Sequence, residues 1–372
     1  MYLLLHRAIR NAGDFLIFER ALALLSSRLP GADFRIGQAS RPLAGQFSTA
    51  DIAAARAIIV CGGPGYQRGM YPGVYPLLPL SQLRVPVVLM ALGSFYLPGR
   101  TSSSSGHVFD GPSRQLLSAI TAAGGTLGAR DVLTAELLRA EGFDQVLMTG
   151  DPAWYDLEHI GEPFNPPGRP VRLAFTPPAN PLFFAQAFSL LEGMAEAVGV
   201  TNISVVFHRD RQRPFDALAR RFGMRTIDIT GGAAGFMTYD DHDAHIGYRV
   251  HAHLYCLSRG KVSYLVAEDS RGVGVLRTLG LLGSDAVART PARWFQRVAW
   301  SGLPRGASPR HRSRSWIGPI ASRMLRMPLV THEVMLQLSD DEHAGFRRHS
   351  AALDVIRSTV PVMHKMIEAI PR

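Results

Sequence analysis

Short apolar runs recur along the chain, and each ends in a loop of glycine or polar residues. Ala57–Cys61 (AIIVC) leads directly into a glycine pair, and Val85–Ala91 (VPVVLMA) is followed by Gly93-Ser94. Helical patterns separate such runs, as at Asp131–Glu141. Continuous apolar runs are typical of strands buried on both faces, and their alternation with helices predicts a parallel sheet covered on both sides.

This alternation occurs twice. The segment 161–170 (GEPFNPPGRP) is rich in proline and glycine and is interpreted as a linker. Five further strands are predicted after it: Val171–Phe175, Ile203–Phe207, Arg225–Ile229, Ala244–Tyr248 and Lys261–Ala267. We therefore predict an α/β fold with two Rossmann-like domains in tandem, residues 1–160 and 171–285, and a central cleft between them. Ligands of such sheets bind beyond the carboxyl ends of the strands.

The last part of the chain, residues 286–372, differs in composition. Ala286–His332 holds nine arginines and three tryptophans but no Asp or Glu. One interpretation is peripheral contact with an anionic membrane or with the diphosphate of a lipid-linked acceptor. The other is that these arginines pair with acids elsewhere in the fold. Apolar residues from Phe346 to Ile370 recur at helical spacing, which predicts C-terminal helices, bent at Pro361, that pack back on the N-terminal domain.

Charge and cysteine content narrow the possible partners. The net charge is +10, almost all from arginine, which favours anionic partners such as phosphates or acidic glycans. No nucleic-acid reading motif accompanies the charge, so nucleic acid is not expected. Cys61 and Cys256 exclude a disulfide framework and a cysteine zinc cluster, and both are expected in the core.

The expected compartment is the cytoplasm, including the inner face of the cytoplasmic membrane. The N-terminal apolar run, MYLLLHRAIRNAGD, is too short for a signal peptide and its charges follow the run. No stretch of about 18 apolar residues suggests a spanning helix.

Arg249 and His251 lie where a predicted strand meets a predicted helix. A helix N-terminus offers unpaired N–H groups and a partial positive charge, so a guanidinium there favours a phosphate or carboxylate site. A histidine in the first helical turn could donate a proton to the same ligand. The alternative is that Arg249 pairs with a neighbouring carboxylate and His251 packs in the core.

Five short motifs in order along the chain resemble those of the polysaccharide pyruvyl transferases. They are Asn11-Ala-Gly13-Asp14, Gly62-Gly63, Ala129-Arg130-Asp131, Gly150-Asp151-Pro152-Ala153 and Arg249-x-His251. The resemblance covers about residues 1–285. It implies a GT-B-like fold and transfer of the carboxyvinyl-derived group of phosphoenolpyruvate to a sugar, forming a pyruvate ketal. The implied acceptor is a bacterial exopolysaccharide or its lipid-linked repeat unit, and no cofactor is expected.

The resemblance also implies roles for individual residues. His251 would be the general acid, and Asp14 would accept a proton from the sugar hydroxyl. The residues that would bind the donor are Arg249, Arg271, Arg130 and His208. The residues that would bind the acceptor are Asn11, Gly13, Gly62, Gly63 and Asp151. Family members often carry a lysine after the last strand, where this chain has Glu268-Asp269-Ser270-Arg271, so Arg271 is the candidate to replace it.

Three of these sites have simpler interpretations. Asp14 directly precedes an apolar helical run and is expected to cap that helix. His208 could belong to a surface loop. The sequence Asp240-Asp241-His242-Asp243, with His245, offers metal-ligand types, but a solvated polar loop is favoured and no metal is expected.

Two other functions stay open. A nucleotide-sugar glycosyltransferase with the same architecture would need an acidic residue for the ribose, which Glu268-Asp269 could supply. A non-catalytic protein of a polysaccharide assembly complex could retain the fold without the chemistry.

Overall fold

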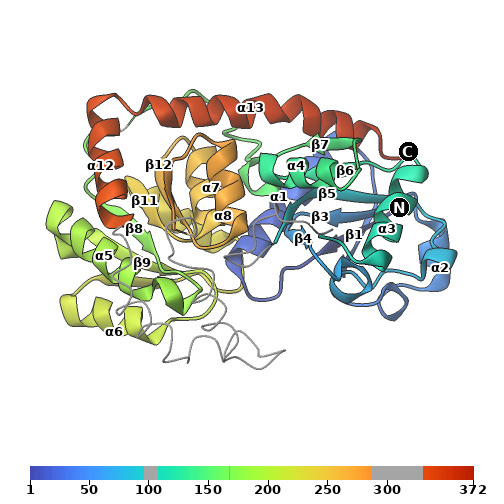
Figure 1. The fold of residues 1–372 in the computed structure, drawn as a ribbon, viewed down its shortest axis with the longest axis horizontal. Helices are drawn as coiled ribbons and strands as arrows, with labels where there is room; N and C mark the ends of the chain where they lie inside the picture. Colours follow the sequence, from blue (N-terminus) through green and yellow to red (C-terminus); the bar gives the residue numbers. More distant parts are fainter. Residues whose placement is uncertain (96–107, 167, 287–329) are drawn as a thin grey trace. The chain divides into compact units, whose positions relative to one another are not determined.

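The computed structural model describes residues 1–95, 108–166, 168–286 and 330–372. The chain forms two compact units. Unit 1 comprises the described residues of Met1–Tyr96, Ser102–Gly161 and Asp354–Arg372, and unit 2 those of Glu162–Leu353. Each unit is a parallel sheet with helices between its strands (Figure 1).

Unit 1 is built on a sheet in the order β2-β1-β3-β5-β6-β7, with β4 paired to β5. The strands are β1 (Tyr2–His6), β2 (Phe34–Gln38), β3 (Ile58–Cys61), β4 (Pro64–Tyr66), β5 (Val87–Ser94), β6 (Leu127–Ala129) and β7 (Val146–Met148). The helices between them are α1 (Ala12–Arg28), α2 (Thr49–Ala54), α3 (Gly111–Ala122) and α4 (Val132–Ala140). The strand order reverses between β1 and β3, which makes this the topological switch point of the sheet.

Alternate residues of the central strands of unit 1 face opposite sides of the sheet. Leu3 and Leu5 of β1 pack with Leu116 and Leu117 of α3 in one core cluster. Leu4, between them, is fully buried as well. Both faces of these strands are therefore covered, which is why their sequences are continuous apolar runs.

Unit 2 has the strand order β10-β9-β8-β11-β12-β13, all parallel. The strands are β8 (Leu173–Thr176), β9 (Ile203–Phe207), β10 (Arg225–Asp228), β11 (Ala244–Gly247), β12 (Val262–Ala267) and β13 (Gly283–Asp285). The helices between them are α5 (Phe184–Val198), α6 (Arg213–Phe222), α7 (Val250–Ser258) and α8 (Ser270–Thr278). Numbered from its first strand the order is 3-2-1-4-5-6, that of a Rossmann sheet, with the switch point between β8 and β11.

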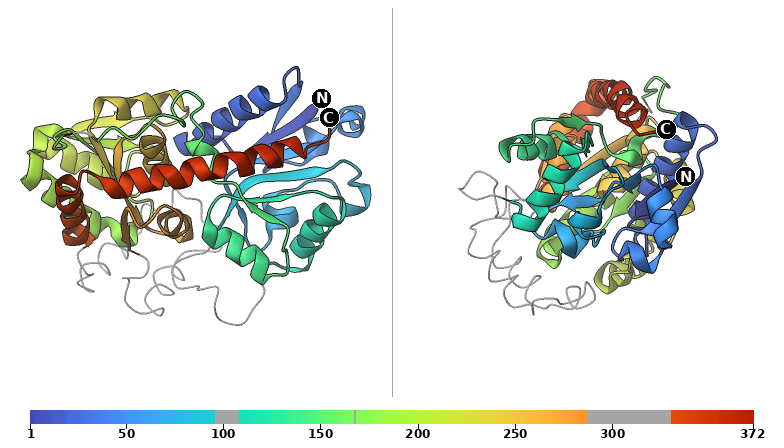
Figure 2. Two further views of the ribbon diagram at one scale, coloured as in Figure 1. Left: turned by 90° about the horizontal axis from the view of Figure 1, so that it is seen from above. Right: turned by 90° about the vertical axis from the view of Figure 1, so that its right-hand side faces the viewer.

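Two C-terminal helices complete the described chain. Residues of α12 (Val330–His343) join the core of unit 2, and Gln337 exchanges hydrogen bonds with the backbone of Gly283 on β13. The last helix, α13 (Arg347–Glu368), contains Pro361 in its interior. Figure 2 shows it as one continuous helix. It belongs to unit 2 up to Leu353 and to unit 1 from Asp354 onward.

The unit 1 part of α13 packs closely on that unit's own residues. Tyr155 donates a hydrogen bond to the carbonyl oxygen of Thr359 at 3.2 Å. A Cβ added to Gly128 of β6 would lie 2.9 Å from the sulfur of Met366. Near the end of the chain, the Tyr2 hydroxyl donates to the carbonyl oxygen of Pro371 at 2.9 Å. Residues of α13 and the segment after it thus pack against the sheet of unit 1.

These elements confirm the predicted α/β class, with two Rossmann-like sheets in tandem and C-terminal helices. Strands β2, β4 and β13 and helices α2 and α12 were not among the expected elements. The basic stretch Ala286–His332 lies mostly outside the described residues, so its arginines and tryptophans have no structural account. Among the helices that are described, none combines the length and apolarity needed to cross a bilayer.

Candidate functional site

Arg249 lies at the switch point of unit 2. It follows β11 and is the N-cap residue of α7, where its own side chain makes no capping hydrogen bond. Its backbone N–H donates to Oγ1 of Thr176, the last residue of β8, at 3.2 Å. The buried Nε of its guanidinium has no hydrogen-bond partner among the described residues. An unpaired guanidinium nitrogen beside an uncapped helix N-terminus is the arrangement that binds anions.

Charges of both signs lie around Arg249. Burial lowers the pKa of Arg249, and the nearby charges of Arg271 and Arg209 lower it further. Glu268 opposes them with its negative charge. Arg271 and Arg209 also have carboxylate partners of their own, Asp269 and Asp210. The case for an anionic ligand therefore rests on the unpaired Nε of Arg249 and the start of α7.

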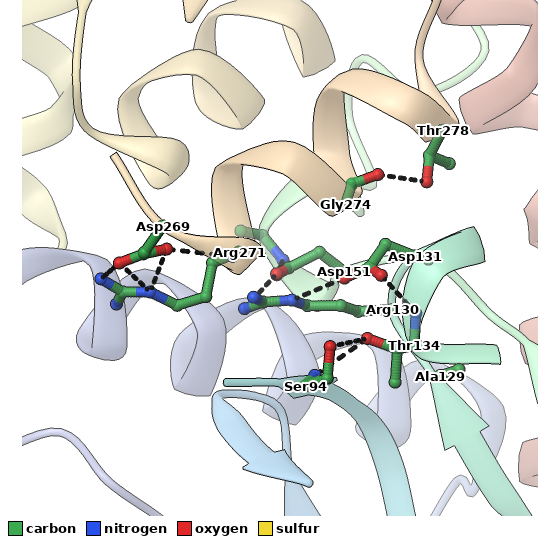
Figure 3. A network of polar contacts seen from close by, with 12 residues as sticks. Ser94, Ala129, Arg130, Asp131, Thr134, Asp151, Asp269, Arg271, Gly274 and Thr278 are labelled. Carbon is green, nitrogen blue, oxygen red and sulfur yellow. Dashed lines mark hydrogen bonds and ion pairs between the residues drawn. The ribbon is translucent and has the colours of Figure 1, made fainter. Parts of the chain in front are cut away.

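Glu268 and Asp269 follow β12, and both carboxylates are engaged. The two oxygens of Glu268 accept hydrogen bonds from the backbone N–H groups of Ala179 and Asn180, at 3.0 and 2.8 Å. Burial raises the pKa of Glu268, while the charge of Arg249 opposes that rise. Asp269 caps α8 and binds the guanidinium of Arg271 through both of its oxygens (Figure 3). Arg271 is thereby fixed in the first turn of α8.

Two histidines lie close to Arg249. His251 is buried in the first turn of α7. His208, directly after β9, is buried with its Nε2 2.5 Å from the Tyr239 hydroxyl and its ring edge-on to Phe236. Burial lowers the pKa of His208 well below its ordinary value, and the charge of Arg249 adds to this effect. His208 is therefore a neutral imidazole in an aromatic cluster, not part of a surface loop.

The switch point of unit 1 holds the glycine motifs. Gly62 and Gly63 follow β3 with positive φ angles of 57° and 79°. A Cβ on Gly62 would lie 2.3 Å from Cγ2 of Ile17 on α1, so only glycine lets this turn and the helix approach. Asn11 is the N-cap of α1 and Gly13 is buried in its first turn. The expected capping role of Asp14 is wrong: α1 begins two residues earlier, and Asp14 lies inside the first turn.

Arg130, Asp131 and Asp151 form a buried group that we call the Arg130 cluster. Arg130 directly follows β6 and its side chain is 1% exposed. Its Nε donates to Oδ2 of Asp131 at 3.2 Å, while Oδ1 of Asp131 caps α4 (Figure 3). Nη1 lies 3.6 Å from Oδ2 of Asp151, close enough for an ion pair but too far for a hydrogen bond.

The Arg130 cluster leaves several buried polar atoms unpaired. Among the described residues, Nη1 and Nη2 of Arg130, Oδ2 of Asp151 and Nε1 of nearby Trp154 have no hydrogen-bond partner. Burial raises the pKa of Asp151, and the charge of Arg130 opposes that rise. Unpaired buried donors and acceptors are costly, so several together indicate a place for a polar ligand or ordered water. Asp14 is near enough for its charge to act on Asp151.

A glycine makes room for Arg130. A Cβ on Gly93 would lie 2.1 Å from the Arg130 Nε. The guanidinium therefore lies directly against the end of β5, a contact that no residue with a side chain permits. Gly93, and Thr176 in unit 2, are structural members of these sites that motif reasoning missed; their only signal was their place at the carboxyl ends of strands.

The acidic segment after Tyr239 forms protein contacts. Asp240 pairs with Arg259, Asp243 pairs with Arg172, and His242 binds the carbonyl oxygen of Thr238. His245 is separate from these residues, buried inside the sheet. A different group, Asp156, Glu158 and His159 of unit 1, has ligand atoms within 4.8 Å of one another. Asp156 already binds Arg20 and His159.

Cys61 and Cys256 are buried, reduced thiols. Burial raises the pKa of Cys61 to about 12 and raises that of Cys256 as well. Since the thiolate is the reactive form, neither side chain is suited to nucleophilic chemistry.

Solved structures match the chain at low similarity. A functionally uncharacterised protein of Klebsiella pneumoniae is 13% identical, with a TM-score of 0.37, over 74% of this chain and 86% of its own. MnaA of S. aureus, in a co-structure with UDP, is 9% identical, with a TM-score of 0.44, over 93% and 97% of the two chains. The wall teichoic acid polymerase TagF is 9% identical, with a TM-score of 0.41, over 99% and 88%. At these levels the likeness bears on neither substrate nor mechanism.

A family profile gives a more specific result. No curated protein matches the chain. The profile of the polysaccharide pyruvyl transferases matches residues 11–270, which include both switch points, the Arg130 cluster and Arg249 with His251. The chain therefore belongs to the polysaccharide pyruvyl transferase family.

Proposed function

We propose that this protein transfers a pyruvate group from phosphoenolpyruvate to two hydroxyls of a sugar, forming a cyclic ketal and releasing phosphate. The observation that carries the proposal is the anion site at the switch point of unit 2. There the buried, unpaired Nε of Arg249 lies at an uncapped helix N-terminus with His251 in the same turn. Family membership supports a transferase with a glycan or sugar acceptor.

Phosphoenolpyruvate suits this site because it carries a phosphate and a carboxylate. We assign one anionic group to Arg249 and the first N–H groups of α7, and the other to Arg271, which Asp269 holds in the first turn of α8. The guanidinium groups of Arg249 and Arg271 offset the repulsion between the two anionic groups. His208 is assigned to the wall of the donor site as a neutral hydrogen-bonding group.

The reaction needs a general acid, which we assign to His251. Protonation of the methylene carbon of phosphoenolpyruvate gives C2 oxocarbenium character, and a sugar hydroxyl adds to C2. A second hydroxyl then forms another C–O bond to C2 while the C–O bond to phosphate breaks. The two sugar hydroxyls release two protons. One restores the proton that the general acid gave to the methylene carbon, and the other leaves with phosphate. Asp14 is assigned to accept a proton from an attacking hydroxyl.

Within unit 1 we assign the Arg130 cluster to substrate recognition. The unpaired nitrogens of Arg130 suit an anionic group, and the unpaired Oδ2 of Asp151 suits a sugar hydroxyl. Asn11, Gly13, Gly62 and Gly63 are assigned to the approach of the acceptor to the backbone at the other switch point. The acceptor is proposed to be an exopolysaccharide or its lipid-linked repeat unit. The basic stretch Ala286–His332 is proposed to bind an anionic membrane surface.

The nucleotide-sugar alternative rested on Glu268 and Asp269 as ribose ligands. Both oxygens of Glu268 already accept backbone N–H groups, and Asp269 is bound to Arg271. These contacts favour the pyruvyl-transfer proposal over that alternative.

The test is donor binding followed by turnover. Phosphoenolpyruvate should raise the melting temperature, and turnover with a glycan acceptor should release inorganic phosphate. Arg249→Ala should weaken donor binding by about 2–3 kcal/mol, the scale of a lost charged hydrogen bond. His251→Ala should abolish turnover but retain donor binding. The exposed Arg213 and His343 provide matched alanine controls. Stabilisation by nucleotide sugars alone would overturn the proposal, and full activity of His251→Ala would remove its role as general acid.

A further inference from the structure

The first turn of α7 lacks the capping groups that a helix normally carries. Its N-cap, Arg249, has a side chain that cannot accept a hydrogen bond, and the third helical residue is Ala252. In a capping box, a Glu or Gln at that third position would accept the N–H of the N-cap residue. Here Thr176 accepts that N–H instead, from the neighbouring strand β8. The polar group that fixes the start of α7 therefore comes from outside the helix.

Thr176 begins a chain of buried hydrogen bonds. Its Oγ1 lies 2.8 Å from Nε2 of His245, on β11. Nδ1 of His245 lies 2.8 Å from the hydroxyl oxygen of Ser263 on β12, which lies 2.9 Å from Nδ1 of His253. His253 is itself a residue of α7, four positions after Arg249. The chain thus leaves α7 at Arg249, crosses three strands and returns to α7 at His253.

All four side chains of this chain are buried, with exposures of 0%. Gly247 allows the close approach, because a Cβ there would lie 2.3 Å from Oγ1 of Thr176. The Ser263 hydroxyl has no other partner among the described residues, so it donates to one imidazole and accepts from the other. Neutral His245 and His253 must therefore carry their ring protons on opposite nitrogens, one on Nδ1 and one on Nε2.

We propose that Thr176, His245, Ser263 and His253 form a brace that positions the first turn of α7, and with it Arg249 and His251, for the donor anion. The brace fixes the position of that turn along the helix axis and its rotation about that axis, because it holds the helix at its N-cap and again four residues later. Thr176 and His245 are positioning residues and need not touch the donor. This inference rests on the proposed function for its effect on donor binding.

The first experiment measures donor affinity and turnover in Thr176→Val, which keeps the shape of the side chain and removes the hydroxyl. We expect the Kd and KM for phosphoenolpyruvate to rise about tenfold while kcat falls less than threefold. Thr176→Ser should bind within twofold of the wild type. Thr226→Val, the same change on β10, is the matched control. Unchanged donor affinity in Thr176→Val would overturn the brace.

A second experiment does not depend on the proposed donor. Hydrogen exchange of the Arg249 amide should become at least tenfold faster in Thr176→Val, with the exchange of β9 amides unchanged. Nitrogen NMR of labelled histidines should show opposite tautomers for His245 and His253. Equal exchange rates or identical tautomers would overturn the brace. If the wild type binds neither phosphoenolpyruvate nor inorganic phosphate, the proposed function fails and these two readouts still decide the brace.

If Thr176→Val fails to fold, Ser263→Ala takes its place. This change cuts the chain between His245 and His253 and leaves the bond from Arg249 to Thr176 intact. We expect the Kd for phosphoenolpyruvate to rise about threefold. A wild-type Kd together with a wild-type His253 signal would contradict the brace.

Discussion

The buried Arg130 cluster of unit 1 is charged, whereas the buried hydrogen-bond chain of unit 2 consists of imidazoles and hydroxyls. In unit 1, Arg130 lies between Asp131 and Asp151. In unit 2, neutral His245 and His253 share hydrogen bonds with Ser263, and charged groups follow the strands β11 and β12 as Arg249, Glu268, Asp269 and Arg271. The same fold thus supports two kinds of polar interior, with opposite responses to pH.

The difference shows what each interior can do. A buried ion pair with unpaired atoms has spare capacity for a ligand, because its desolvation cost is only partly offset within the protein. A closed chain of neutral hydrogen bonds has little capacity for a ligand but holds backbone in place. We therefore propose that the Arg130 cluster recognises substrate, whereas the buried histidines of unit 2 hold the donor site in position.

The largest expected effect comes from removing residues 354–372, the part of the C-terminus that belongs to unit 1. Met363, Met366, Ile367 and Ile370 are buried, and their loss would expose one face of the sheet. We expect unit 1 to unfold or aggregate while unit 2 keeps its structure. Hydrogen exchange read by mass spectrometry should show lost protection in the strands of unit 1, β1–β7, and retained protection in β8–β13. Deletion of Arg372 alone is the control, and a soluble, active truncation would remove the distinction between the units.

The second largest effect is expected from acid, which should destabilise unit 2 more than unit 1. Burial lowers the pKa of His245 to about 3 and of His349 to about 4, and it also lowers the pKa values of His208, His242 and His253. Because the folded pKa lies below the unfolded value near 6.5, unfolding takes up protons as the pH falls. Stability is therefore intact above pH 6.5, and His245 and His349 each remove roughly 1.4 kcal/mol per pH unit between about pH 6.5 and 4. His208, His242 and His253 act in the same direction.

Two buried carboxyl groups act in the opposite sense. Burial raises the pKa of Asp151 in unit 1, so its protonation favours the folded state as the pH falls. Glu268 does the same in unit 2 but is outnumbered there by histidines. We expect a pH series of hydrogen-exchange measurements to show unit 2 opening first below pH 6. His245→Asn should bring the pH at which unit 2 opens closer to the pH at which unit 1 opens. If both units unfold together at every pH, the proposed difference in their pH dependence is wrong.

A smaller effect is expected from Gly93→Ala. The new Cβ would collide with the Arg130 guanidinium, which must move, at a cost of about 1–3 kcal/mol of unfolding free energy. Chemical denaturation would measure this loss, and substrate affinity should fall with it. Gly111→Ala is the control, since nothing lies within 4 Å of a Cβ there. A neutral Gly93→Ala variant would show that the Arg130 cluster tolerates displacement, as a solvated ion pair would.

The smallest effect concerns metal. Asp156, Glu158 and His159 of unit 1 have ligand-type atoms near one another, but Asp156 already binds Arg20 and His159. We expect EDTA and added Mg²⁺, Mn²⁺ or Zn²⁺ to leave the melting temperature of unit 1 unchanged within about 1 °C. A metal-dependent rise that disappears in Glu158→Gln would establish a metal site and a further difference between the units.

Burial explains which strands could be predicted from the sequence. Ile203–Phe207 was predicted at its observed bounds because a strand covered on both faces needs a continuous apolar run. The missed strands are β2, β13 and the three-residue β4. Strands β2 and β13 are at the edges of their sheets. Arg35 and Ile36 of β2 are exposed, and β13 has the sequence Gly-Ser-Asp, so neither carries such a run. Helix α12 was missed because its first residues were assigned to the basic stretch.

The candidate sites were partly predictable for a different reason. Arg249, His251 and Arg130 are recognisable because they follow strands and carry charge or a titratable group. Thr176 and Ser263 are ordinary strand residues, and their roles come from partners 73 and 10 positions away in the sequence. No local pattern encodes those pairings. The N-terminus of α1 was misplaced because Gly13, a poor helix former, weakens the helical signal before Asp14.

Because part of unit 1 follows unit 2 in the sequence, the order of synthesis affects how unit 1 folds. The sheet of unit 1 receives Met366 and Pro371 only after Glu162–Leu353 of unit 2 has been made. At about 5–20 residues per second, the first 161 residues wait roughly 10–40 s for the helix that covers them. During that time one apolar face of a nascent sheet has no covering helix, so newly made unit 1 is the part of this protein that most needs a chaperone.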